Sequence, residues 1–187
     1  MRIHAPGMGV EVLIPDYLES DLRTVMQAAP DILNHNVETV ERLQKPVRKR
    51  AKYDRSLQVL ADAKAMALDI AGRPGTVHTK SSIMVGLGET REELSQTFRD
   101  LRDVDCDILT LGQYLRPSMN HLPVERYVHP DEFEEMKQEG LELGFKHVES
   151  GPLVRSSYHA RDQVPEGAKR NRDARAAALA ANGLATA

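Results

Sequence analysis

Short apolar, β-branched runs alternate with amphipathic stretches along most of this 187-residue chain. The apolar runs, read as strands, cover 10–14, 31–36, 79–85, 106–111 and 145–149. Apolar residues at helical spacing fill the intervals at 18–28, from 56 to the Gly-rich break at 72–75, from 90 to about 103, and from 130 to about 144. Strands separated by helices predict parallel pairing with right-handed crossovers. The predicted fold class is α/β, either a doubly wound sheet or an arc of a (β/α) barrel.

Local signals set several boundaries and the domain organisation. Thr90 and Glu93 have the spacing of a capping box, and Pro130 suits a first helical turn. Residues 37–43 could form a turn of helix, and the basic stretch 44–52 is predicted to be a solvated loop. We predict a non-core extension over 1–8, a partial barrel over 9–162 and a flexible Ala-rich tail over 163–187.

Composition excludes several classes of protein. The net charge of -3 is not that of a typical nucleic-acid-binding protein, which has a basic face. Cys106 is the single cysteine, which excludes an internal disulfide framework and a self-contained thiolate metal site. Because the chain has no apolar run of about 20 residues and no signal peptide pattern at its start, we expect a soluble cytoplasmic protein without membrane or nucleic-acid partners.

Polar residues follow four consecutive predicted strands, where parallel α/β proteins bind ligands. They are Asn34, His35, Asn36 and Glu38; Gly86, Gly88 and Glu89; Gln113, Tyr114, Arg116 and Ser118; and Ser150, Arg155, Ser156, Ser157, Tyr158 and His159. Such clustering favours a cleft for a polar ligand.

Each of these features also has a structural alternative. Gly86 and Gly88 could cradle a phosphate or form a tight turn, and the 34–36 stretch could cap a turn. Arg116 could pair with a surface carboxylate, and His159 lacks an identifiable nucleophile as partner. Cys106, at the start of a strand, is predicted to be a buried and unreactive thiol.

Six stretches, in this order, resemble lipoyl synthase, a radical S-adenosylmethionine (SAM) family. They are residues 10–16, 30–40, 79–90, 106–118, 121–127 and 151–160, so that the resemblance spans about 9–162. It implies an incomplete TIM-like barrel of about five parallel strands. It also implies insertion of two sulfur atoms, at C6 and C8 of a protein-bound octanoyl group.

The resemblance implies cofactors and partners as well. Members of the family use SAM and two [4Fe–4S] clusters, one that cleaves SAM to a 5′-deoxyadenosyl radical and an auxiliary one that supplies sulfur. The implied carriers are octanoylated lipoyl domains of 2-oxoacid dehydrogenase E2 subunits or the glycine-cleavage H protein. The implied electron donor is a flavodoxin or a ferredoxin.

One departure from the family is large. The family has two cysteine triplets in its N-terminal part, one for each cluster, and neither triplet is present here. We therefore expect a truncated form that alone binds no stable [4Fe–4S] cluster and inserts no sulfur. Loss of the first barrel strands should leave a sheet edge and apolar inward side chains uncovered, which predicts marginal stability or association.

The resemblance assigns roles to matching residues only. Ser156 corresponds to a serine ligand of the auxiliary cluster. The implied SAM or substrate pocket contains Asn36, Glu38, Gly86, Gly88 and Glu89, although Ser82 stands where the family commonly has glycine. Gln113, Tyr114 and Arg116 are expected at the barrel interior or mouth, near the substrate.

Three interpretations remain open from the sequence. The chain is an enzyme of this family in truncated form, a non-catalytic barrel subunit or remnant that binds the octanoyl or lipoyl carrier domain, or a non-functional fragment. A partner that supplies cysteines would favour the second.

Overall fold

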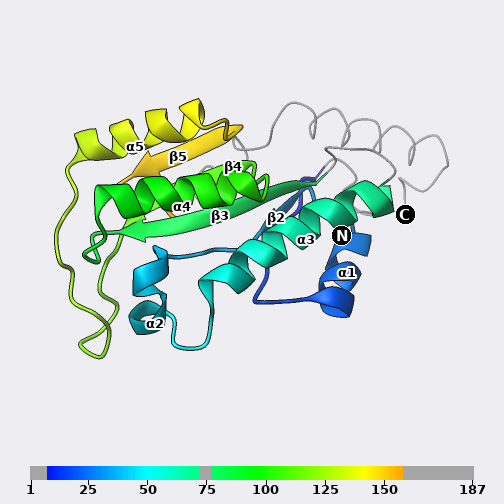
Figure 1. The fold of residues 1–187 in the computed structure, drawn as a ribbon, viewed down its shortest axis with the longest axis horizontal. Coiled ribbons are helices and arrows are strands. Elements are labelled where there is room, and N and C mark those ends of the chain that lie inside the picture. Colours follow the sequence, from blue (N-terminus) through cyan, green and yellow to red (C-terminus); the bar gives the residue numbers. More distant parts are fainter. Residues whose placement is uncertain (1–7, 72–76, 158–187) are drawn as a thin grey trace.

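The computed structural model describes residues 8–71 and 77–157, and in this part of the chain five strands form one parallel sheet (Figure 1). The strands follow in the order β1 (Glu11–Leu13), β2 (Ile32–Asn34), β3 (His78–Val85), β4 (Ile108–Gln113) and β5 (His147–Gly151). The helices are α1 (Glu19–Gln27), the 3-10 helix Glu41–Leu43, α2 (Gln44–Val47), α3 (Tyr53–Ala71), α4 (Arg91–Asp103) and α5 (Pro130–Glu142). The prediction of an α/β fold with about five parallel strands is confirmed.

The helices bury the apolar side chains of one sheet face. Ile83 and Leu109, at alternate positions of β3 and β4, belong to one core cluster with Phe98 of α4 and Phe133 of α5, and each is at most 1% exposed. A second cluster joins α1 and α3 to the start of the sheet through Leu22, Met26, Leu33, Val59 and Ala63. Successive β-α-β units thus cover this sheet face with two separate apolar clusters.

The opposite sheet face carries more polar side chains than the sequence led us to expect, although the buried Ile32 and Ile108 also lie on it. By alternation, Asn34, Lys80, Ser82 and Thr110 share this inner face, and β2–β3 and β3–β4 pairing sets them in register. The fully buried Lys80 donates from Nζ to Glu11 Oε1 at 3.0 Å. Burial lowers the pKa of Lys80, and attraction to Glu11 opposes that shift. A polar face needs less apolar cover than the sequence led us to expect.

A buried carboxylate holds the amino-terminal end of the sheet together. Asp107, just before β4, accepts from Lys64 Nζ at 2.5 Å and from the Thr79 backbone N–H at 2.9 Å. Lys146 Nζ lies 2.7 Å and His78 Nδ1 3.3 Å from the same carboxylate. Burial alone would raise the pKa of Asp107, but hydrogen bonds and charges from these neighbours outweigh it and hold that pKa low.

Both predicted helix starts are confirmed. The Thr90 side chain accepts from the Glu93 backbone N–H, and the Glu93 carboxylate accepts from the Thr90 N–H at 2.9 Å. Pro130 occupies the first turn of α5 behind His129, which caps it. Residues 37–43 include the expected helical turn at Glu41–Leu43.

Several predicted boundaries are wrong by a few residues. α3 begins at Tyr53 rather than Ser56, because the buried Tyr53 ring joins the core and its hydroxyl donates to Asp100 Oδ2 at 2.8 Å. β4 begins at Ile108 rather than Cys106, and β5 at His147 rather than Phe145. The basic stretch 44–52 is not all loop, since α2 occupies Gln44–Val47.

The predicted tail over 163–187, Tyr158 and His159, and all but residue 8 of the predicted N-terminal extension lie outside the described residues. None of the described helices has the length and apolar character needed to cross a membrane.

Asp107→Asn should lower the free energy of unfolding at pH 7 by about 3 kcal/mol, because the ammonium groups of Lys64 and Lys146 lose their common partner. The carboxyl pKa is lower in the folded than in the unfolded state, so its stabilisation is complete above the unfolded value near ~4 and is lost as the pH falls through the folded value. Urea unfolding from pH 7 downward should therefore show the two proteins converging below about pH 4. The exposed Asp103→Asn is the control, and an equal loss there would contradict this role of Asp107.

Candidate functional site

A pocket of about 340 Å³ opens at the carboxyl ends of the strands and brings together residues that the sequence predicted. Five of them line it from segments that are far apart in sequence, which shows how parallel pairing gathers strand ends: Asn36, Glu38, Gln113, Arg155 and Ser156. The remaining lining residues are Leu13, Ser82, Ile83, Met84, Thr110, Gly112, Leu115 and Val154.

Asn36 and Glu38 form a fixed pair at the end of β2. Asn36 Nδ2 donates to Glu38 Oε1 at 3.1 Å, whereas Asn36 Oδ1 is buried and has no hydrogen-bond partner in the structure. Glu38 has a positive φ of 65°, and its backbone pairs with β3 through bonds to Ser82 O at 3.0 Å and from Met84 N at 2.8 Å. The pair therefore offers a carboxylate and an unused amide oxygen to a ligand with hydrogen-bond donors.

A glycine in β4 allows Ser156 to reach the pocket. A Cβ on Gly112 would collide with the backbone carbonyl of Val154, in the loop that follows β5. That loop also bends back through a hydrogen bond from the Val154 N–H to Gly151 O at 3.1 Å. The half-buried Ser156 thus lines the same pocket as the hydrogen-bonded hydroxyls of Ser82 and Thr110.

The glycine turn after β3 does not line this pocket. Its own carboxylate closes it: Glu89 accepts from the Gly86 N–H at 2.6 Å and from the Leu87 N–H at 2.9 Å. Gly86 and Gly88 have φ values of 97° and 96°, so both occupy the left-handed region. Of the two alternatives left by the sequence, the structure has the tight turn, in which the chain's own anion occupies the amides.

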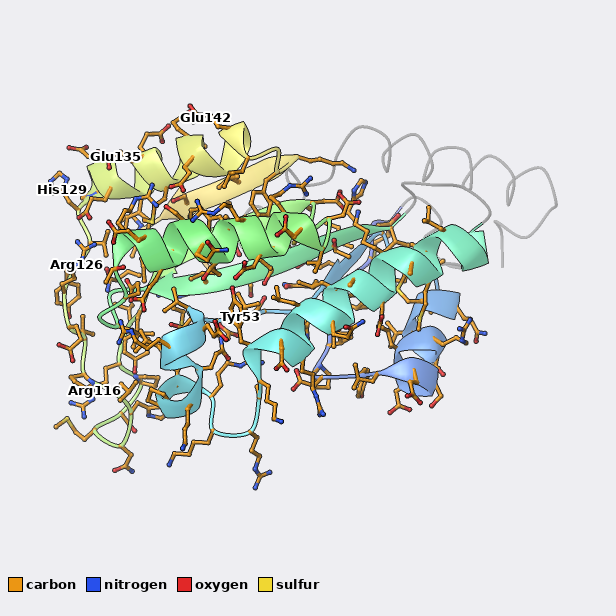
Figure 2. All side chains as sticks on the ribbon, in the orientation of Figure 1. Tyr53, Arg116, Arg126, His129, Glu135 and Glu142 are labelled. Atoms are coloured by element: carbon orange, nitrogen blue, oxygen red, sulfur yellow. The ribbon has the colours of Figure 1, made fainter. Side chains whose placement is uncertain are left out.

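Gln113, Tyr114 and Arg116 hold the long β4–α5 connection. Gln113 accepts from the Val128 N–H at 2.9 Å and donates to Arg126 O at 3.1 Å, and it also faces the pocket. The buried Tyr114 donates to Leu122 O at 2.9 Å. Arg116, labelled in Figure 2, donates to the carbonyls of Met119 at 2.6 Å and His121 at 2.9 Å. Tyr114 and Arg116 do not line the pocket.

Sequence reasoning missed the charged inner face beneath the pocket. Lys80 lies two residues before Ser82 on the same strand, and Asn34 Nδ2 donates to Glu11 Oε1 at 3.1 Å. Strict alternation through 78–85 was an available signal, because it places Lys80 and Ser82 on one face. The pairing of Lys80 with Glu11 could not be predicted from the sequence, because it depends on the order of the strands in the sheet.

Comparison with known families identifies the chain's relatives. A model described as the radical SAM superfamily matches residues 1–101, more than half of the chain. The chain belongs to the radical SAM superfamily. This radical SAM protein is 54% identical over 185 residues to the lipoyl synthase of Rubrobacter xylanophilus. The alignment covers 98% of this chain and 53% of that enzyme. The lipoyl synthase of Bacillus cytotoxicus is 58% identical over 173 residues, 91% of this chain and 55% of that enzyme.

A third relative, the lipoyl synthase of Shouchella clausii, is 55% identical over 179 residues, 95% of this chain and 55% of that enzyme. The resemblance found in the sequence is thereby confirmed. The chain spans about half the length of the curated relatives it matches. Among solved structures, an HMG-CoA lyase from Brucella melitensis aligns with 94% of this chain and 75% of its own at 12% identity and a TM-score of 0.43, too low to support an argument.

Radical SAM family membership implies SAM and iron–sulfur cofactors, and the residues of this chain do not fit a cluster. Cysteine thiolates hold such clusters, whereas Cys106 is fully buried and burial raises its pKa to about 12. It lies at the amino end of β4, away from the pocket at the carboxyl ends. Among residues 8–71 and 77–157, no group of three His, Cys, Asp or Glu side chains could hold a metal ion.

Gly86→Ala and Gly88→Ala form a matched pair that tests the turn. Both strain a left-handed backbone, but only at Gly86 would the added methyl strike the Arg126 carbonyl and the Gln113 side chain; at Gly88 the nearest atom is Glu125 Cγ at 3.4 Å. We expect Gly88→Ala to cost about 1 kcal/mol of unfolding free energy and Gly86→Ala about 2 kcal/mol more. Urea unfolding measures both, and equal losses would contradict the packing of Gly86 against the β4–α5 connection.

Proposed function

We propose that this chain forms the ligand-binding part of a lipoyl synthase, which inserts sulfur at C6 and C8 of a protein-bound octanoyl group. The observation that supports this most is the strand-end pocket, in which Asn36, Glu38, Gln113 and Ser156 meet although they are far apart in sequence. The same positions match the lipoyl synthase stretches of the sequence. The high identity to curated lipoyl synthases supports the same function.

Asn36 and Glu38 are proposed to bind SAM or the substrate. The buried Asn36 Oδ1 without a partner, and the Glu38 carboxylate beside it, suit a ligand that has hydroxyl or ammonium donors. SAM has both kinds of donor and a positive charge. Gln113 would orient the ligand from β4, since its side chain is already fixed by Val128 and Arg126.

The other predicted site residues are proposed to act by shaping the site. Gly86, Gly88 and Glu89 set the turn beside the site, because Glu89 fixes the amides of that turn. Tyr114 and Arg116 keep the β4–α5 connection, and with it Leu115 in the pocket wall, in place. An ordered wall lowers the entropy cost of holding the substrate.

Ser156 is proposed to be a ligand of the auxiliary cluster, as the resemblance implies, with all thiolate ligands supplied from outside these 187 residues. The single buried Cys106 cannot provide them. This chain alone is then inactive. Octanoylated lipoyl domains or the H protein would be the substrates, and a flavodoxin or ferredoxin the electron donor.

A second candidate is a non-catalytic subunit that binds the octanoyl or lipoyl carrier domain. The observation that favours it is the location of Cys106, which is buried at the opposite end of β4 from the pocket. Binding of the carrier would then persist without sulfur insertion.

A fusion tests these two functions. The N-terminal part of the Bacillus cytotoxicus lipoyl synthase, with both cysteine triplets, is joined to residues 9–187 and assayed anaerobically on an octanoylated lipoyl domain by mass spectrometry. Formation of the lipoyl product supports the synthase. A folded fusion with its full iron content that binds the domain but forms no product would favour the non-catalytic subunit instead.

Within that fusion, Ser156→Ala and Ser157→Ala should behave differently. Ser156 lines the pocket, whereas its exposed neighbour Ser157 does not. We expect Ser156→Ala to lower the rate of sulfur insertion by at least about tenfold and Ser157→Ala to leave it near that of the parent fusion. Equal rates for the two variants would contradict a ligand role for Ser156.

A further inference from the structure

Basic side chains without an ion-pair partner among the described residues extend from α2 to the first turn of α3. Five exposed side chains in 11 residues, here called the basic segment, form no ion pair with any described residue: Lys45, Lys49, Arg50, Lys52 and Arg55. Elsewhere, Arg42 pairs with Glu93 and Arg126 with Glu132, at 2.6 and 2.8 Å. On a chain of net charge -3, this concentration of unused positive charge is a local exception.

Hydrogen bonds of Gln44 and Arg48 anchor the backbone beside the exposed cations of the basic segment. Gln44 Nε2 donates to the carbonyls of Val37 at 2.7 Å and Thr39 at 2.8 Å. Arg48, inside the segment, donates from Nη1 to Val37 O at 3.3 Å and to Ser56 Oγ at 3.1 Å. The anchoring residues 37–39 directly follow Asn36 and include Glu38 of the pocket. The cations are therefore held next to the segment that lines the site.

The chemistry of the basic segment favours a protein over a nucleic acid. Its single aromatic residue, Tyr53, is buried and cannot stack on a base. The outer side of α5, by contrast, presents the exposed carboxylates of Asp131, Glu134, Glu135 and Glu142, which would repel a polyanion that extends over the molecule. Figure 2 shows Glu135 and Glu142 on α5, at the opposite border of the molecule from Arg116. A compact acidic surface fits better than a long one.

We propose that the basic segment is the docking surface for an acidic face of the protein domain that presents the octanoyl group to the pocket. This proposal rests on the proposed function for the identity of the partner. Exposed charges around a site mainly raise the association rate and make it dependent on salt. Because Gln44 and Arg48 already anchor the neighbouring backbone, docking has to order mainly the exposed Lys and Arg side chains.

The test measures association of the full 187-residue chain with an octanoylated lipoyl domain by surface plasmon resonance at low and at physiological ionic strength. Lys49→Glu combined with Arg50→Glu should lower the association rate constant at low salt by about tenfold and weaken its salt dependence. The matched control, Arg23→Glu with Arg99→Glu, makes the same charge change at exposed positions on α1 and α4 and should leave both near the parent values.

Three results would overturn the proposal: equal loss in the two double variants, no measurable binding of the domain at low salt, or equally tight binding of duplex DNA or anionic vesicles through the same residues. The measurement needs no catalysis, so failure of the synthase proposal is seen separately. In an active fusion, the basic-segment variant should lower kcat/KM and leave kcat at saturating carrier near the parent value.

Discussion

Parallel pairing of β2 to β5 is the constraint on which the site depends. It brings the ends of strands that are distant in sequence to one edge of the sheet, where Asn36, Gln113 and Ser156 meet in a single pocket. Two details make the pocket possible: a bend at Glu38 held by β3, and a glycine at 112 that lets the last loop approach β4. The sheet therefore decides where the segments that follow its strands meet, and those segments carry Asn36, Glu38 and Ser156.

Charge is distributed along the strands according to position. At the amino ends, the Asp107 carboxylate contacts Lys64 of α3, His78 and Lys146, an arrangement that stabilises the sheet. On the inner face, the buried Lys80 and Glu11 satisfy each other beneath the pocket. In (β/α) architectures, residues at the amino ends of the strands usually stabilise the fold, and residues at the carboxyl ends bind ligands. The basic segment adds a third kind of charge, which is exposed and unpaired.

The sequence predicted the fold class, the Thr90 capping box and the place of Pro130 in the first turn of α5, because these depend on local spacing. Thr90 and Glu93, for example, are three residues apart and contact each other directly. The prediction failed where contacts between residues distant in sequence determine the structure. The start of α3 depends on the hydrogen bond from Tyr53 to Asp100, and the polar groups of the inner face depend on the contact of Lys80 in β3 with Glu11 in β1, on the other side of β2. For the site, strand-end position found Asn36, Glu38, Gln113, Arg155 and Ser156 of the polar lining but not Ser82 and Thr110, which lie within the strands. It could not separate residues that face the pocket from those that stabilise a turn.

The central claim is that these residues provide the pocket of a lipoyl synthase while the thiolates of its clusters come from outside them. Anaerobic reconstitution of the purified 187-residue chain, followed by iron and sulfide analysis and absorption spectroscopy, tests this most directly. The account predicts no stable [4Fe–4S] cluster, because Cys106 is buried as a thiol and no other cysteine is present. A cubane spectrum with near-stoichiometric iron and sulfide would contradict it.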